Sequence, residues 1–253
     1  MAIQSFFTAS VLTLASLASA LPPPPAIGRP ILPLNVSVPG VPKPIATAQI
    51  SCPIVFSGQI PKAAALTDFD SAATSLFNPN NVKGNDKWSQ ILLFPASADS
   101  ARFDDAAAQK PLEVTINDRS IFKTQNGFRR AGLLFKDDTN TQGPGNTGVK
   151  TLHWSVKQDP ARPLNLTHEY LNVWHEAGDF SGNQFNFEAG TLIGQETAGP
   201  ADTFKFLNRK NELIFQTPID KTGKWQGFAV TLDFNQKYVP SFSALYFSNR
   251  PAG

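Results

Sequence analysis

The chain is poor in the residue types that build metal centres and disulfide frameworks. It has one cysteine and three histidines among 253 residues. Cys52 therefore has no partner within the chain, and one interpretation is a buried thiol that packs as a small apolar side chain. The histidines, His153, His168 and His175, lack ligand spacing, so we expect no metal and no cofactor.

Charge runs and nucleotide-binding motifs are also missing. The 22 basic and 20 acidic residues nearly balance, and no cluster of lysine or arginine occurs. Nucleic acid is therefore not an expected partner. The patterns G-x-x-x-x-G-K-[ST], G-x-G-x-x-G and G-x-S-x-G do not occur either. These absences argue against a phosphate-binding loop and against a serine hydrolase.

The N-terminal segment 1–20 is apolar and ends in Ala18-Ser19-Ala20, a small-x-small pattern typical of signal peptide cleavage. It is too short and too rich in serine and threonine to span a bilayer. We therefore expect a secreted, extracellular protein without a membrane anchor. Sequons at Asn35 and Asn165 fit secretion.

Proline is concentrated in one stretch, residues 21–50, which holds nine of the 21 prolines. Such a density fixes φ and removes backbone donors, so this stretch is predicted to be a linker or a disordered arm. The folded domain is then expected over residues 51–234. Residues 235–253 form an atypical tail.

Short apolar runs that are rich in β-branched and aromatic residues alternate with turn residues throughout the domain. This pattern predicts an all-β fold, an antiparallel β-sandwich of the jelly-roll type. One short helix is expected within residues 62–77. The predicted strands read PIVFSG, ILLFP, LEVTIND, GFRRAGLLF, GVKTLHWSV, THEYLNVWHE, NQFNFEAG, ELIFQTP and WQGFAVTLDF.

The stretch THEYLNVWHE, residues 167–176, contains two glutamates and two histidines. In a regular strand Glu169 and His175 share one face, whereas Tyr170, Trp174 and Glu176 lie on the other, where the two aromatic residues are expected to be core. Glu169 and Glu176 also lie on the order of 23 Å apart along a strand. Paired carboxylates of glycosidases are only about 5 to 10 Å apart, so these two cannot act as a pair.

Several longer stretches resemble the catalytic domain of fungal glycoside hydrolase family 131. They are CPIVFSG, LTDFDS, SIFKTQNGFRRAGLLF, the run from TGVKTLHWSV to LNVWHE, QFNFEAGTLIGQ and WQGFAVTLDF, and together they cover residues 52–235 in order. The resemblance implies a secreted jelly-roll β-glucanase that acts on β-1,3, β-1,6 and β-1,4 linkages. It also implies a β-glucan as the partner, and we expect a monomer.

The same resemblance implies two important carboxylates. One matches Glu169; the other is expected after FRRA, where this chain has Gly132. Glycine has no proton to give and no charge to hold, so a second carboxylate would have to come from elsewhere, and Glu113 and Glu188 are the alternatives. We expect Glu169 to be catalytic. Arg130, on the face of Gly132 if that stretch is a strand, and His175, on the face of Glu169, are expected to bind substrate.

The tail after Phe234 ends earlier than the family pattern. The sandwich is therefore expected to lack C-terminal strands as one alternative. In that case the cysteine that the resemblance implies as the partner of Cys52 would be missing from the chain. Three functions stay open from the sequence. They are a β-glucan hydrolase, a glucan-binding domain with impaired catalysis because of Gly132, and a polysaccharide lyase that uses Arg129 or Arg130 against a uronate.

Overall fold

The computed structural model describes residues 3–6, 53–95, 101, 104–121, 123–138, 144–194, 199–235 and 244–248. Most of the expected signal segment, the proline-rich stretch, Cys52 and most of the tail lie outside these residues. Within the described part of the chain, no helix is long and apolar enough to cross a membrane.

The described elements are almost entirely antiparallel strands, which confirms the all-β prediction. The strands are β1 (Ile3–Phe6), β2 (Ile60–Pro61), β3 (Leu92–Leu93), β4 (Gln109–Lys110), β5 (Glu113–Ile116), β6 (Val149–Val156), β7 (Glu169–Glu176), β8 (Asn183–Gly190), β9 (Thr203–Asn208), β10 (Leu213–Pro218), β11 (Gln226–Asp233) and β12 (Ala244–Ser248). The helical elements are η1 (Leu66–Asp70), α1 (Trp88–Ile91), η2 (Asp118–Ser120) and η3 (Pro144–Asn146).

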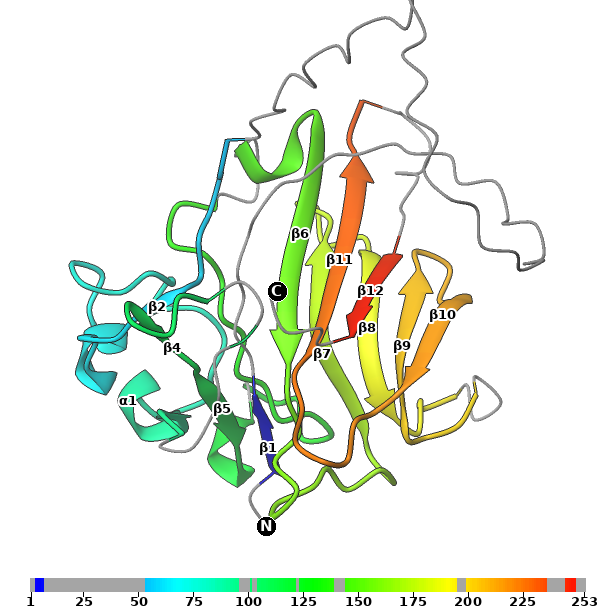
Figure 1. Ribbon diagram of the computed structural model, residues 1–253, viewed down its shortest axis with the longest axis horizontal. Helices are drawn as coiled ribbons and strands as arrows, with labels where there is room; N and C mark the ends of the chain where they lie inside the picture. Colours follow the sequence, from blue (N-terminus) through cyan, green and yellow to red (C-terminus); the bar gives the residue numbers. More distant parts are fainter. Residues whose placement is uncertain are drawn as a thin grey trace, which may run out of the picture.

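Two sheets face each other and form a β-sandwich (Figure 1). One has the order β12-β11-β6 and the other the order β10-β9-β8-β7. The space between them is filled by aromatic and aliphatic side chains from both sheets. This first core comprises Trp154, Val156, Tyr170, Phe185, Phe187, Ala189, Phe204, Phe206, Ile219, Phe228, Val230 and Leu232. The jelly-roll order of the connections stays a prediction.

A smaller unit lies beside the sandwich, next to β6 in Figure 1. It contains the sheets β1-β5-β3 and β2-β4 together with η1 and α1. Its own hydrophobic core comprises Ile60, Phe69, Phe77, Trp88, Ile91, Leu92, Leu112 and Val114. The chain thus has two cores, and the long strands all belong to the first.

One local prediction is confirmed in this smaller unit and one is wrong. The short helix expected within residues 62–77 is present as the 3-10 helix η1, which ends where Ser71 adopts an extended backbone. The stretch GFRRAGLLF is not a strand, and its ladder contacts are isolated bridges at Arg129 and Phe135. The strand alternation that placed Arg130 and Gly132 on one face therefore does not apply.

Candidate active site

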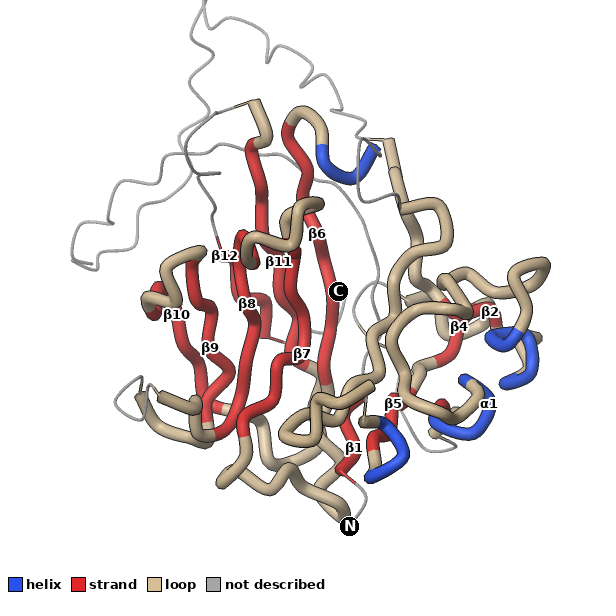
Figure 2. The backbone as a smooth tube through the Cα atoms, turned by 180° about the vertical axis from the view of Figure 1, so that it is seen from behind, coloured by secondary structure: helices blue, strands red, loops and turns tan. Residues whose placement is uncertain are grey.

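The sheet β10-β9-β8-β7 has one face in the core and one face turned away from it (Figure 2). Alternation along β8 sends Phe185, Phe187 and Ala189 into the core. Asn186 and Glu188 lie on the other side. We call this side the outer face, and the carboxylate and amide groups of the sheet gather there.

A β-bulge in β7 changes which of its residues share the outer face. Leu171 pairs with Glu188, and Val173 pairs with Phe187. Glu188 and Phe187 are consecutive in β8, whereas Leu171 and Val173 are separated by Asn172, so Asn172 is the extra residue of the bulge. A one-residue shift moves every following side chain to the opposite face. The alternation of side chains between the two faces, counted from Glu169, is therefore correct only up to Leu171.

The bulge overturns two expectations from the sequence. Trp174 pairs with Asn186 and so lies on the outer face with Glu169, not in the core. His175 pairs with the core residue Phe185, and its ring lies 5.3 Å from that of Phe234. The prediction that His175 shares the face of Glu169 is wrong. The expectation that His175 binds substrate was based on that shared face, so it is no longer supported by it. Tyr170 is buried in the core, as expected.

Glu169 lies at the first position of β7, where the strand meets the loop that follows β8. Its side chain is half-buried, and its Oε2 accepts the backbone N–H of Ile193 at 2.6 Å. The carboxylate is thus fixed by a backbone donor on the outer face, away from the hydrocarbon of the core. Glu176 lies at the far end of β7, opposite Asn183.

A second carboxylate lies next to Glu169. Glu169 pairs with Gly190 and Leu171 with Glu188, so Glu169 and Glu188 occupy diagonal positions on the outer face. Diagonal positions in an antiparallel pair are about 7–8 Å apart. Glu188 is only 5% exposed. Burial, followed by the charge of Glu169, raises the pKa of Glu188 to about 7.

Lys205 on β9 lies directly opposite Glu188. Its ammonium donates to the backbone oxygen of Gly190 at 3.1 Å and to that of Thr203 at 3.4 Å. Burial lowers the pKa of Lys205, while Glu188 acts in the opposite direction. A positive charge is therefore held beside the two carboxylates, where it stabilises the ionised form of Glu188.

Gly132 lies beside Trp174 of β7. A Cβ at this position would lie 3.5 Å from Cη2 of Trp174 and 3.3 Å from Nδ2 of Asn81. The same Asn81 amide donates to the Gly132 carbonyl at 2.7 Å. The position where the sequence lacks a carboxylate is therefore adjacent to the outer face.

The other predicted or alternative residues have partners of their own. Arg130 donates from Nη1 to Oε1 of Gln125 at 3.2 Å. Glu113 belongs to β5 in the smaller unit, where Arg162 contacts its carboxylate at 3.2 Å. Of the two acids considered as substitutes for the missing one, Glu188 is therefore the neighbour of Glu169.

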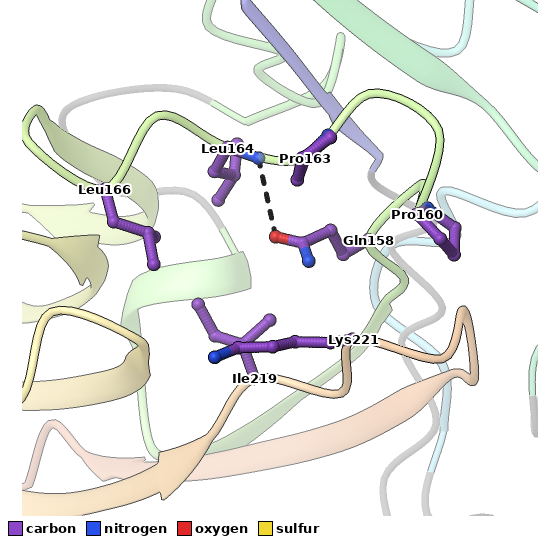
Figure 3. Close-up of a pocket in the computed structure, with 7 residues that line it drawn as sticks. All are labelled: Gln158, Pro160, Pro163, Leu164, Leu166, Ile219 and Lys221. Carbon is purple, nitrogen blue, oxygen red and sulfur yellow. Dashed lines mark hydrogen bonds between the residues drawn. The ribbon is translucent and has the colours of Figure 1, made fainter.

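A cavity of about 260 Å³ lies apart from this polar cluster (Figure 3). Leucine, isoleucine and proline side chains form most of its wall, and its one charged residue, Lys221, is paired with Asp202 at 2.8 Å. It presents no carboxylate for acid–base chemistry. The lining residues are Gln158, Pro160, Pro163, Leu164, Leu166, Ile219 and Lys221.

The described residues contain no cluster of three or more His, Cys, Asp or Glu side chains that is able to hold a metal ion. A comparison with curated proteins gives no match. The family model of the glycoside hydrolase 131 catalytic N-terminal domain matches residues 54–250. The chain belongs to glycoside hydrolase family 131.

This family membership makes the chain a glycoside hydrolase with a glucan as its substrate. The family 131 match spans the sandwich, the smaller unit apart from β1, and most of residues 235–253. Both Glu169 and Gly132 lie within it. The carboxylates on the outer face of this family 131 domain are suited to protonating a glycosidic oxygen and activating water.

Proposed function

We propose that this chain is a secreted β-glucanase that cleaves β-1,3, β-1,6 and β-1,4 linkages, with Glu169 as a catalytic carboxylate. The observation that carries the proposal is the position of Glu169. Its carboxylate is fixed by the Ile193 N–H on the sheet face opposite the core, beside a second acid, Glu188. Hydrolysis of a glycosidic bond needs such paired carboxyl groups.

Trp174 supports a sugar-binding role for the same face. The bulge turns its indole toward the side of Glu169, and the ring is half-buried. An aromatic ring combines a large apolar surface with a defined geometry. The partners of Trp174 and Glu169 on β8, Asn186 and Gly190, are four residues apart, so a glucan that packs on Trp174 would reach Glu169 after about 13 Å of strand length.

The test is hydrolysis by the purified protein and by its Glu169→Gln variant. Laminarin, a β-1,6-glucan and cello-oligosaccharides are incubated with each, and new reducing ends are measured. Wild-type protein is expected to release reducing ends, and the variant is expected to lose about 100- to 10,000-fold in rate. A wild-type protein that releases none from all three substrates contradicts the proposal. Secretion is tested separately, by N-terminal sequencing of the exported chain, which is expected to start at Leu21.

A second candidate function is a glucan-binding domain with impaired catalysis. Gly132 favours it, because the family resemblance places a carboxylate at this position and the structure places it against Trp174. This candidate predicts slower migration in a glucan-containing gel without release of reducing ends. Recovery of hydrolysis in Gly132→Glu would identify the missing carboxyl group as the cause.

A further inference from the structure

We propose that Glu188 is the proton donor of the hydrolysis, the second carboxyl group that Gly132 does not supply. This inference rests on the proposed function, in which Glu169 is the other carboxylate. It assigns a role to a residue of β8 that lies on a different strand from Glu169 and on a different segment from Gly132.

The pairing of β7 with β8 supplies the geometry. Leu171, directly opposite Glu188, lies two residues after Glu169, so the two acids are diagonal neighbours on one face. Their positions are about 7–8 Å apart. Carboxyl groups that act across one glycosidic bond are separated by about 5 to 9.5 Å. Residue positions this close allow the two carboxyl groups to reach the separation that the reaction requires.

The surroundings of the two acids differ in the direction that acid–base catalysis needs. Glu188 is buried and next to a negative charge, and its pKa is about 7, so it keeps its proton in weakly acidic solution. Glu169 is more exposed, and its Oε2 accepts the backbone N–H of Ile193. A buried carboxyl group with a raised pKa beside a more exposed carboxyl group is typical of the proton donor in an acid–base pair.

The proposed step is balanced in atoms and charge. Glu188 gives its proton to the bridging oxygen while the bond from that oxygen to the anomeric carbon breaks. The oxygen of a water molecule bonds to the anomeric carbon, and Glu169 takes the proton that this water loses. The products are two shorter glucans, with Glu188 ionised and Glu169 protonated, and exchange with solvent restores both groups.

Lys205 has a place in this step. Its ammonium lies opposite Glu188, and its charge opposes the rise in the pKa of Glu188. When Glu188 gives up its proton, the negative charge that it gains is stabilised by this cation. Lys205 is a positioning residue in this scheme, because it acts through Glu188.

Glu113 is the matched control. It is also a buried glutamate whose pKa is raised by burial, but it lies on β5 and contacts Arg162. Glu113→Gln and Glu188→Gln therefore make the same chemical change in two buried sites. Only the second is next to Glu169.

The experiment uses two classes of substrate. One is a laminari-oligosaccharide, whose leaving sugar needs a proton. The other is the 2,4-dinitrophenyl glycoside of laminaribiose, whose leaving group departs without one. Glu188→Gln is expected to lose about 100- to 10,000-fold in kcat on the first and less than about tenfold on the second, and Glu113→Gln is expected to retain wild-type rates on both.

Three outcomes overturn the assignment. They are unchanged rates in Glu188→Gln, an equal loss on both substrates, and an equal loss in the Glu113→Gln control. A wild-type protein that cleaves neither substrate overturns the proposed function together with this inference, whereas an active wild type with an active Glu188→Gln overturns only the inference.

A measurement on the unaltered protein covers the case in which Glu188→Gln does not fold. Carbon-13 NMR of labelled glutamate side chains follows each carboxyl group through a pH titration. Glu188 is expected to titrate near pH 7. Titration in the ordinary range of glutamate, around pH 4 to 5, overturns the inference.

Discussion

Gly132 lies beside Trp174, and a Cβ added to Gly132 would lie 3.5 Å from the indole Cη2. The segment that contains Gly132 therefore approaches the outer face of the four-stranded sheet. The same geometry also shows how much room a larger side chain would have. Asn81 Nδ2, at 3.3 Å from the same Cβ, is the closer neighbour and lies at the end of a side chain that is able to shift.

Gly132→Glu is expected to fold and to increase glucan hydrolysis by tenfold or more, because it adds a carboxyl group beside the outer face. Gly132→Ala is the matched control. It adds the Cβ without the acid, and it should change the free energy of unfolding by less than about 1 kcal/mol. Reducing-end assays and urea denaturation measure the two effects. Equal activity of both variants would show that the missing carboxyl group does not limit the rate.

Trp174→Ala is expected to weaken glucan binding by about tenfold, because a stacking contact of about 0.5–1.5 kcal/mol is removed from the outer face. Trp174→Phe keeps an aromatic ring and should retain most of the affinity. Calorimetry with laminari-oligosaccharides gives both dissociation constants. Unaltered binding in Trp174→Ala would place the sugar elsewhere.

Glu188 should also make stability depend on pH. Its pKa in the folded chain is about 7, against 4.5 for the unfolded chain, so the folded state binds more protons between these values. Stability then falls as pH rises from about 4.5 to 7, by up to a few kcal/mol.

The difference between wild type and Glu188→Gln isolates this contribution. His153 and His175, whose pKa values are lowered by burial, act with the opposite sign, but they are common to both proteins. Urea denaturation at a series of pH values should show wild type losing stability relative to the variant over this window. A constant difference would contradict the raised pKa.

Deletion of Asn172 tests the β-bulge. Without the extra residue, Leu171 and Val173 become neighbours and still face Glu188 and Phe187, so the core and the outer face keep their residues. Asn172 also has a buried Nδ2 without a hydrogen-bond partner, and its removal relieves that cost. The deletion is therefore expected to fold, with a free energy of unfolding within about 2 kcal/mol of wild type.

A regular β7 gives the opposite expectation for this deletion. Every residue after position 171 would move to the other face, so the core would lose Trp174 and gain Val173. Failure of the deletion variant to fold would therefore argue for a strand without the bulge. Deletion of Tyr170, a core residue that no bulge compensates, is the control that should unfold the domain.

The strands that the sequence predicts well are those with one clear turn at each end. GVKTLHWSV, THEYLNVWHE, NQFNFEAG, ELIFQTP and WQGFAVTLDF contain β6, β7, β8, β10 and β11. The sequence pattern does not predict strand β9, TFKFLN. Five of its six residues are buried, including Lys205, so it shows neither the polar face nor the alternation of a half-exposed strand.

The candidate site was predictable in part, for a similar reason. The family resemblance and the position in a predicted strand are enough to identify Glu169 as a candidate. Glu188 is one of the two alternatives for the acid that is absent at Gly132. Strict alternation places Trp174 and His175 on the wrong faces, because it takes no account of the extra residue Asn172. The bulge becomes visible only when β8 is aligned with β7, and this alignment is a tertiary contact.

The bulge also sets how substitutions should be tolerated along β7. Before Asn172 the odd-numbered positions point away from the core, and after it the even-numbered ones do. A saturation library over Glu169–Glu176 should therefore show polar replacements accepted in two out-of-phase series. The alternation changes at Asn172, between Glu169 and Trp174. The extra residue therefore allows one strand to present both the Glu169 carboxylate and the Trp174 indole to the same ligand.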